Sequence, residues 1–183
     1  MNARLILITG AQAAGKTTIG NALARLLPKA VHVDGDAIAE FVVSGAIGMD
    51  LPPPPGAMEQ LYLRYRGSIA VANVYRDKGF DAVVSDNMFG ETLTDVIAMG
   101  HETGDVHVIA LDPDIASIEE RELGRGKSGY TETVTPQALV DALRNETARV
   151  GLWHDNSGET VAETASRLLE KLDAALVPRP ASA

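Results

Sequence analysis

The feature that most constrains the fold is an apolar run followed at once by a glycine-rich segment. Residues 5–8 are all aliphatic, and the pattern Gly10-x-x-x-x-Gly15-Lys16-Thr17 comes directly after them. This spacing, between a strand and a helix, is typical of a phosphate-binding loop, in which main-chain N–H groups curl around a phosphate. The alternative is a plain Gly/Ala turn, but the apolar run before it and the amphipathic segment after it favour the phosphate loop.

The segment supplies most of the expected nucleotide-binding residues. Lys16 would reach the outer phosphates as a catalytic point charge, and the Thr17 hydroxyl would ligate magnesium. The expected binding set is Gly10, Ala11, Gln12, Ala13, Ala14, Gly15, Lys16, Thr17 and Thr18. The sequence holds neither the Asn-Lys-x-Asp guanine motif of GTPases nor the Ser-Gly-Gly-Gln signature of transporter ATPases. The compact kinases are the class that remains.

Short apolar runs alternate with longer amphipathic segments along the chain, which predicts βαβ units and an α/β fold with a parallel sheet. We expect a single domain over residues 1–176 and a disordered tail over 177–183. Gly79 and Gly100 are expected to cap the C-terminal ends of helices. The predicted strands span residues 4–9, 30–33, 82–85, 106–111 and 150–153. The predicted helices begin at Gly15, Asp36, Met58, Glu91, Asp114, Pro136 and Glu159.

Acidic residues follow the second and third predicted strands. Asp34 and Asp36 come at the end of the second strand, where ligands of open α/β sheets bind. Phosphoryl transfer to an alcohol needs a carboxylate that orients the hydroxyl and accepts its proton, and we assign this role to Asp36 and a metal-side role to Asp34. The alternative is that Asp36 caps a helix. Asp86 would hold magnesium or close a turn, and Asn87 could contact the substrate.

Arginines occur in two places where they could meet an anion. Arg121 and Arg125 belong to a glycine-rich, charged segment, and we expect a lid at about 121–131 whose arginines neutralise the transferred phosphoryl. The alternative is a solvated loop in which these arginines pair with neighbouring glutamates. Arg64 and Arg66 either bind an anionic acceptor or are ordinary surface residues, and exposure statistics favour the surface.

The bulk composition limits the class of partner that the protein can bind. The formal net charge is −9 and no block of basic residues occurs, so nucleic acid is a poor candidate and a small-molecule hydroxyl acceptor fits better. No signal peptide or membrane span is expected, because the apolar run at the start is too short. The absence of cysteine fits a cytoplasmic protein. Monomer and homodimer both remain open.

Taken together, the motifs resemble a known family. Gly10-x-x-x-x-Gly15-Lys16-Thr17, the Asp34-Gly-Asp36 pair and the arginine-rich lid look like those of small P-loop kinases of the shikimate and gluconate kinase type. The resemblance is strongest to the chloramphenicol phosphotransferase-like branch, which also carries a short Asp-x-Ser segment before the last helix, here residues 155–157.

The resemblance implies a three-layer P-loop NTPase fold with a five-stranded parallel sheet in the order 2-3-1-4-5, a helical lid, and ATP with Mg²⁺. Asp36 matches the carboxylate that activates the acceptor, and Arg125 best matches the lid arginine, with Arg121 second. Arg121 and Asn156 would border the nucleotide.

The functional prediction is an ATP-dependent kinase that transfers the γ-phosphoryl group to a hydroxyl of an antibiotic or of a sugar or acid metabolite. Two alternatives stay open. One is a nucleotide kinase, and the other is a nucleotide-binding regulatory protein with little or no transfer activity.

Overall fold

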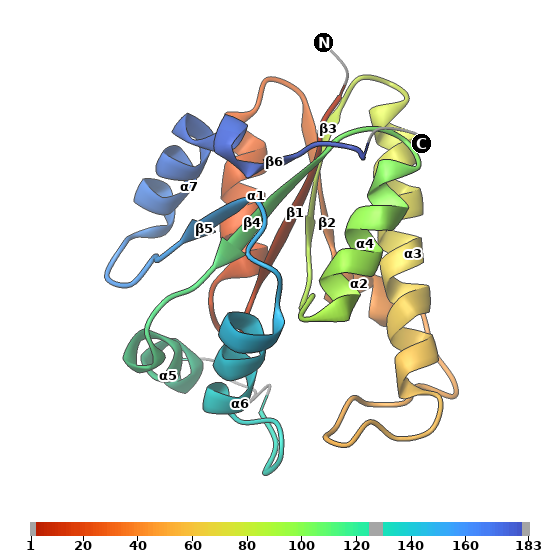
Figure 1. The fold of residues 1–183 in the computed structure, drawn as a ribbon, viewed down its shortest axis with the longest axis vertical. Helices are drawn as coiled ribbons and strands as arrows, with labels where there is room; N and C mark the ends of the chain where they lie inside the picture. The colour runs from red at the N-terminus through yellow and green to blue at the C-terminus, as the bar shows by residue number, and fades with distance from the viewer. Residues whose placement is uncertain (1–2, 125–129, 181–183) are drawn as a thin grey trace.

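A parallel sheet forms the centre of this computed structural model, which describes residues 3–124 and 130–180. Five parallel strands follow the order β2-β3-β1-β4-β5, which confirms the predicted fold class and strand order (Figure 1). β1 pairs with β3 and with β4, so Leu5 lies opposite both Ala82 and Val106. The strands span Leu5–Gly10 (β1), Ala30–Asp34 (β2), Asp81–Ser85 (β3), Val106–Leu111 (β4) and Leu152–His154 (β5).

A further short strand was not predicted. β6 (Leu176–Val177) pairs antiparallel with β4, with Val177 opposite Val106. β5 pairs only with the second half of β4, so the first half of the same edge is open to β6. The expected disordered tail at 177–183 is therefore wrong for Val177, and the main-chain N–H of Arg179 also donates to Asp105 at 3.1 Å. Residues 181–183 lie outside the described part of the chain.

Helices cover both faces of the sheet, which gives the three layers (Figure 1). Alternate side chains of β1 point to opposite faces: Leu5 and Leu7 pack under α3 and α4, whereas Ile6 and Ile8 pack under α1 and α7. The helices are α1 (Lys16–Leu26), α2 (Gly35–Ala39), α3 (Ala57–Arg76), α4 (Glu91–His101), α5 (Ile115–Leu123), α6 (Pro136–Asp141) and α7 (Val161–Glu170), with a π-helical turn η1 (Ala142–Glu146) and a 3₁₀ turn η2 (Leu172–Ala175).

The helix ends follow local capping chemistry, and α1 to α6 begin at the predicted residue or one residue from it. Thr135 caps α6, which begins at Pro136 as predicted, and Gly79 lies two residues after Asp77, the C-cap of α3, with a φ of 78°. α7 begins two residues later than predicted, because Thr160 and Glu163 form a capping box. Gly100 is not a cap: it lies inside α4, where a Cβ atom would come 2.6 Å from Val106 Cγ2. Its missing side chain lets α4 approach the sheet.

The predicted lid begins in the last turn of α5, which contains Arg121. Arg125 and the rest of residues 125–129 lie outside the described part of the chain. None of the described helices combines the length and the apolar character needed to cross a membrane.

Candidate active site

The predicted phosphate loop joins β1 to α1 at the carboxyl end of the sheet, and its backbone requires the glycines. Gly10 lies so close to β4 that a Cβ atom would sit 2.6 Å from the carbonyl oxygen of Leu111. Gly15 has a φ of 98° and Ala13 a φ of 64°, both in the left-handed region. No described side chain caps the start of α1 at Gly15. The first-turn N–H groups of α1 are thus left without a side-chain cap, as at helix ends that bind anions.

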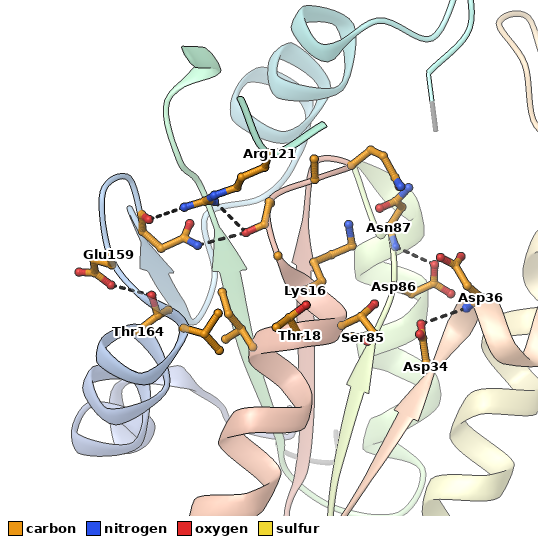
Figure 2. A pocket seen from close by; sticks show the side chains of 18 residues that line it. Lys16, Thr18, Asp34, Asp36, Ser85, Asp86, Asn87, Arg121, Glu159 and Thr164 are labelled. Carbon is orange, nitrogen blue, oxygen red and sulfur yellow. Dashed lines mark hydrogen bonds between the residues drawn. The ribbon is translucent and has the colours of Figure 1, made fainter. Parts of the chain in front are cut away.

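This loop forms the floor of a cavity of about 540 Å³ (Figure 2). Two predicted loop residues do not line it: Gly10 packs against β4, and Ala11 is buried, with its carbonyl oxygen accepting a hydrogen bond from Lys16 Nζ at 2.9 Å. The cavity brings most of the remaining predicted site residues together. Its lining includes Gln12, Ala13, Ala14, Gly15, Lys16, Thr17, Thr18, Asp34, Asp36, Asp86, Asn87, Arg121 and Asn156.

One end of the cavity, which we call the acidic end, carries Asp34, Asp36 and Asp86. Asp34 accepts a hydrogen bond from the main-chain N–H of Asp36 at 3.2 Å and so caps α2. The alternative that Asp36 is the cap is therefore wrong. The Asp36 side chain is 70% exposed and is left available to a ligand in the cavity.

Asp86 is the buried member of the acidic end. Its side chain is 3% exposed, and Oδ1 accepts hydrogen bonds from the Asn87 main-chain N–H at 2.7 Å and from Arg64 at 2.6 Å. Burial raises the pKa of Asp86 to about 6, although the positive charge of Arg64 opposes this shift. The Asp86 carboxylate is thus held in one orientation at the end of β3.

Arg64 is the main residue that the sequence interpretation missed. Its side chain is only 19% exposed, and its two terminal nitrogens lie 2.6 Å from Asp86 and 3.6 Å from Asp36. The expected surface position is therefore wrong for Arg64, whereas Arg66 is exposed as predicted. The sequence did carry a hint that Arg64 is not at the surface. Arg64 directly precedes Tyr65, and Tyr65 and Ser68 belong to the buried face of α3.

Gly35 explains how Asp86 fits beneath α2. A Cβ atom at Gly35 would lie 2.0 Å from Asp86 Oδ2, so only a glycine leaves room for the carboxylate. Asp86 Oδ2 is buried and has no hydrogen-bond partner among the described residues. The middle residue of Asp34-Gly35-Asp36 thus has a packing role that the sequence pattern did not reveal.

The opposite end of the cavity, which we call the base end, is built from the β5–α7 connection and α7. Asn156 Nδ2 donates to the carbonyl oxygen of Ala14 at 3.1 Å, so this connection is fixed to the phosphate loop. Arg121 donates to the carbonyl oxygens of Asn156 at 2.8 Å and Ala14 at 3.3 Å. The alternative in which Arg121 pairs with neighbouring glutamates is not what the described structure shows.

Glu159 at the base end was not predicted as a site residue. It accepts hydrogen bonds from His154 at 2.9 Å and Thr164 at 2.8 Å, and it also pairs with Arg167. These partners fix the wall formed by α7 (Figure 2). No sequence motif identifies such a residue, because His154 reaches it only through the turn that joins β5 to α7.

The described residues offer no ready-made cluster of metal ligands. Within residues 3–124 and 130–180, no group of three or more His, Cys, Asp or Glu side chains is arranged to hold a metal ion. This agrees with the usual binding of Mg²⁺ through one or two carboxylates together with substrate phosphates. The three residues predicted to hold the metal, Thr17, Asp34 and Asp86, all line the cavity.

Comparison with solved structures decides the fold family. A sugar kinase from Janibacter sp. HTCC2649 superposes with a TM-score of 0.69 at 19% identity, covering 94% of this chain and 96% of that one. The tunicamycin resistance protein of Deinococcus radiodurans gives 0.67 at 18% identity, covering 96% and 99%. This is the fold of the small P-loop kinases.

Other small P-loop kinases superpose in the same way. Shikimate kinase from Bacteroides thetaiotaomicron gives a TM-score of 0.64 at 18% identity, with 93% of this chain and 98% of that one covered. No protein-family model and no curated protein sequence matches the chain. At these identities the likeness concerns the P-loop kinase fold.

Proposed function

We propose that this protein is an ATP-dependent small-molecule kinase that transfers the γ-phosphoryl group of ATP to a hydroxyl group. One observation carries the proposal: the phosphate loop and the carboxylates of Asp36 and Asp86 line the same cavity. A triphosphate held by the loop would have its outer end beside these carboxylates. A protein that only binds nucleotide has no need of an exposed carboxylate there.

The loop would bind the triphosphate through main-chain N–H groups and the N-terminus of α1. Lys16 would exchange its contact with the carbonyl oxygen of Ala11 for the outer phosphates. Bound Mg²⁺ would supply neutralisation of the phosphate charge during transfer. Thr17 would hold the ion together with Asp34 or Asp86. The base of ATP would lie at the base end, beside Asn156.

Asp36 would orient the acceptor hydroxyl and accept its proton. As the new bond forms between the hydroxyl oxygen and the γ-phosphorus, the bond from that phosphorus to the β-phosphate oxygen breaks and ADP leaves. The exposure of Asp36 supports this role, because the carboxylate can reach a ligand without breaking a capping bond.

The arginines of the lid segment would neutralise charge on the transferred phosphoryl. Arg121 donates to two main-chain carbonyl groups and would have to exchange them for phosphate oxygens. Arg125 is the second candidate for this role. Both assignments rest on sequence position and on the location of Arg121 in the cavity lining.

The names of the structural neighbours cover different acceptors, including a sugar kinase, a shikimate kinase and a tunicamycin resistance protein. We therefore propose a sugar or acid metabolite or an antibiotic as the acceptor class. A nucleotide kinase is the second candidate, because a thymidylate kinase from Candida albicans also superposes, with a TM-score of 0.58. A nucleotide-binding regulatory protein is the third.

The test is ATP turnover with and without a panel of hydroxylated metabolites, antibiotics and nucleoside monophosphates. Stimulation of ADP release by one compound, with a phosphorylated product seen by mass spectrometry, supports the kinase. Tight ATP binding without transfer to any acceptor supports the regulatory protein. Product formed only from nucleoside monophosphates would replace the first proposal by a nucleotide kinase.

A further inference from the structure

The acidic end and its surroundings carry information on the acceptor, if the proposed function is correct. The base end and the phosphate loop account for the nucleotide, and Lys16 lies between them and the acidic end (Figure 2). The acceptor hydroxyl must then lie beside Asp36, and the rest of the acceptor must contact the chain around it.

The stretch of chain around Asp36, residues 30–63, is unusual in its charge. No Lys or Arg occurs from residue 30 to residue 63, although the stretch contains Asp34, Asp36, Glu40, Asp50 and Glu59. His32 does not replace them: it is hydrogen-bonded to Ser85 at 2.9 Å, and burial lowers its pKa. An anionic acceptor would find no cation in this segment.

Arg64 is the first cation after the stretch, and its charge is already matched. Its guanidinium lies 2.6 Å from Asp86 and 3.6 Å from Asp36. Asp86 cannot move far, because Gly35 packs directly against its carboxylate. An acceptor carboxylate or phosphate that drew Arg64 Nη2 away from Asp86 would leave Asp86 buried and without its partner, which is strongly unfavourable. One that approached Nη1 instead would meet the carboxylate of Asp36, which lies 3.6 Å from that nitrogen. Arg64 is therefore a positioning residue for the two aspartates.

The loop between α2 and α3 offers apolar surface instead. We call residues 40–56 the strap. It lies at the same end of the sheet as α5 and α6 (Figure 1), and Asp50 accepts hydrogen bonds from Thr131 and Thr133 in the segment that precedes α6. The strap carries exposed apolar side chains: Phe41, Val42, Val43, Ile47, Met49 and Leu51.

We propose that the acceptor is an alcohol that carries no anionic group. The acidic end and the stretch without Lys or Arg disfavour an anionic group on the acceptor, and Arg64 is already paired with the two aspartates. The strap adds no cation and exposes apolar side chains. Within the classes proposed above, this selects a neutral compound over an acid metabolite or a nucleotide.

Matched pairs of probes test this charge preference. Each pair shares one shape and one hydroxyl group and differs only by a neutral amide or an anionic carboxylate: mandelamide with mandelate, and 4-(hydroxymethyl)benzamide with 4-(hydroxymethyl)benzoate. The protein is first saturated with Mg-AMP-PNP, and the heat of that binding is recorded by calorimetry. Probe binding is then measured by saturation-transfer NMR, and phosphoryl transfer is measured with Mg-ATP.

We expect the amide of each pair to bind at least five-fold more tightly than its carboxylate and to be the better acceptor. Equal or tighter binding of the carboxylates would overturn the inference while leaving the kinase proposal intact. No heat with Mg-AMP-PNP would instead remove the proposed function itself.

A charge variant provides an independent arm that needs no turnover. Asp36→Asn removes one negative charge from an exposed position, so folding should be preserved. The amide-to-carboxylate affinity ratio should fall about five-fold, the effect of one charge roughly 4 Å away in water. Asp77→Asn makes the same charge change at the far end of α3 and should leave the ratio unchanged. A ratio that Asp36→Asn does not move would contradict the inference.

Discussion

Arg64 Nη2 lies 2.6 Å from Asp86 Oδ1, and this buried ion pair joins α3 to the end of β3. Tyr65, the next residue on α3, donates its hydroxyl to the carbonyl oxygen of Asn87, so two consecutive side chains fix the helix to the same loop. The pair therefore contributes to the fold and also sets the shape of the acidic end.

Replacing Arg64 should destabilise the protein more than an exposed arginine does. Arg64→Met leaves the Asp86 carboxylate buried without its partner, and we expect a loss of about 3–5 kcal/mol in the free energy of unfolding. Urea denaturation of this variant and of Arg66→Met, an exposed arginine on the same helix, provides the comparison. Equal stability of the two variants would show that the ion pair is not formed.

Asp86 should make stability depend on pH in a direction opposite to that of a surface carboxylate. Its pKa is raised from 3.8 to about 6 by burial, so the folded state binds the proton more readily than the unfolded state. Stability is then highest below the unfolded pKa and falls by roughly 3 kcal/mol as pH rises from about 4 to about 6. The measurement is the difference in unfolding free energy between the wild type and Asp86→Asn across this range. A flat difference would refute the raised pKa.

Asp36→Asn should abolish transfer and keep ATP affinity. The amide cannot accept the hydroxyl proton, and we expect kcat to fall about 10²–10⁴-fold. Calorimetry with Mg-AMP-PNP should give an unchanged dissociation constant, because the proposed mechanism places Asp36 against the acceptor and not the nucleotide. Transfer at the wild-type rate would remove Asp36 from the mechanism.

Lys16→Ala should weaken both nucleotide binding and turnover, since the same charge meets the outer phosphates in the ground state and during transfer. The matched control is Lys171→Ala, at the end of α7, which should change neither. Nucleotide affinity measured by calorimetry separates the two variants, and wild-type affinity in Lys16→Ala would contradict the assignment of the loop.

Gly35→Ala tests the contact between α2 and Asp86. The new methyl group would overlap Asp86 Oδ2, and we expect about 1–3 kcal/mol of destabilisation. Gly48→Ala is the control, because nothing lies within 4 Å of a Cβ atom at Gly48. Thermal unfolding should separate these variants. Similar melting temperatures would mean that α2 shifts to accommodate the methyl group without a loss of stability.

The sequence predicted the features that depend on local pattern. The apolar run before Gly10, the alternation of strands and helices, and Pro136 as the start of a helix are local signals, and each led to the observed element. The features that were missed depend on tertiary contacts. Arginine is a residue type usually found at the surface. Arg64 is partly buried because the fold places Asp86, at the end of β3, next to it.

Two further differences have the same physical origin. Gly100 reads as a helix end in the sequence, yet its role is the close approach of α4 to β4. β6 is too short to show periodicity and forms because β5 leaves part of an edge unpaired. The role of Arg125 as a lid arginine stays a prediction, because that residue lies outside the described part of the chain.

The bare Cα of Gly35 has a consequence for how this site can change during evolution. The position tolerates a side chain only if residue 86 becomes smaller, and an aspartate at 86 can persist only while 35 stays glycine. These two positions should therefore substitute in concert among divergent descendants of this chain, although they lie 51 positions apart in the sequence.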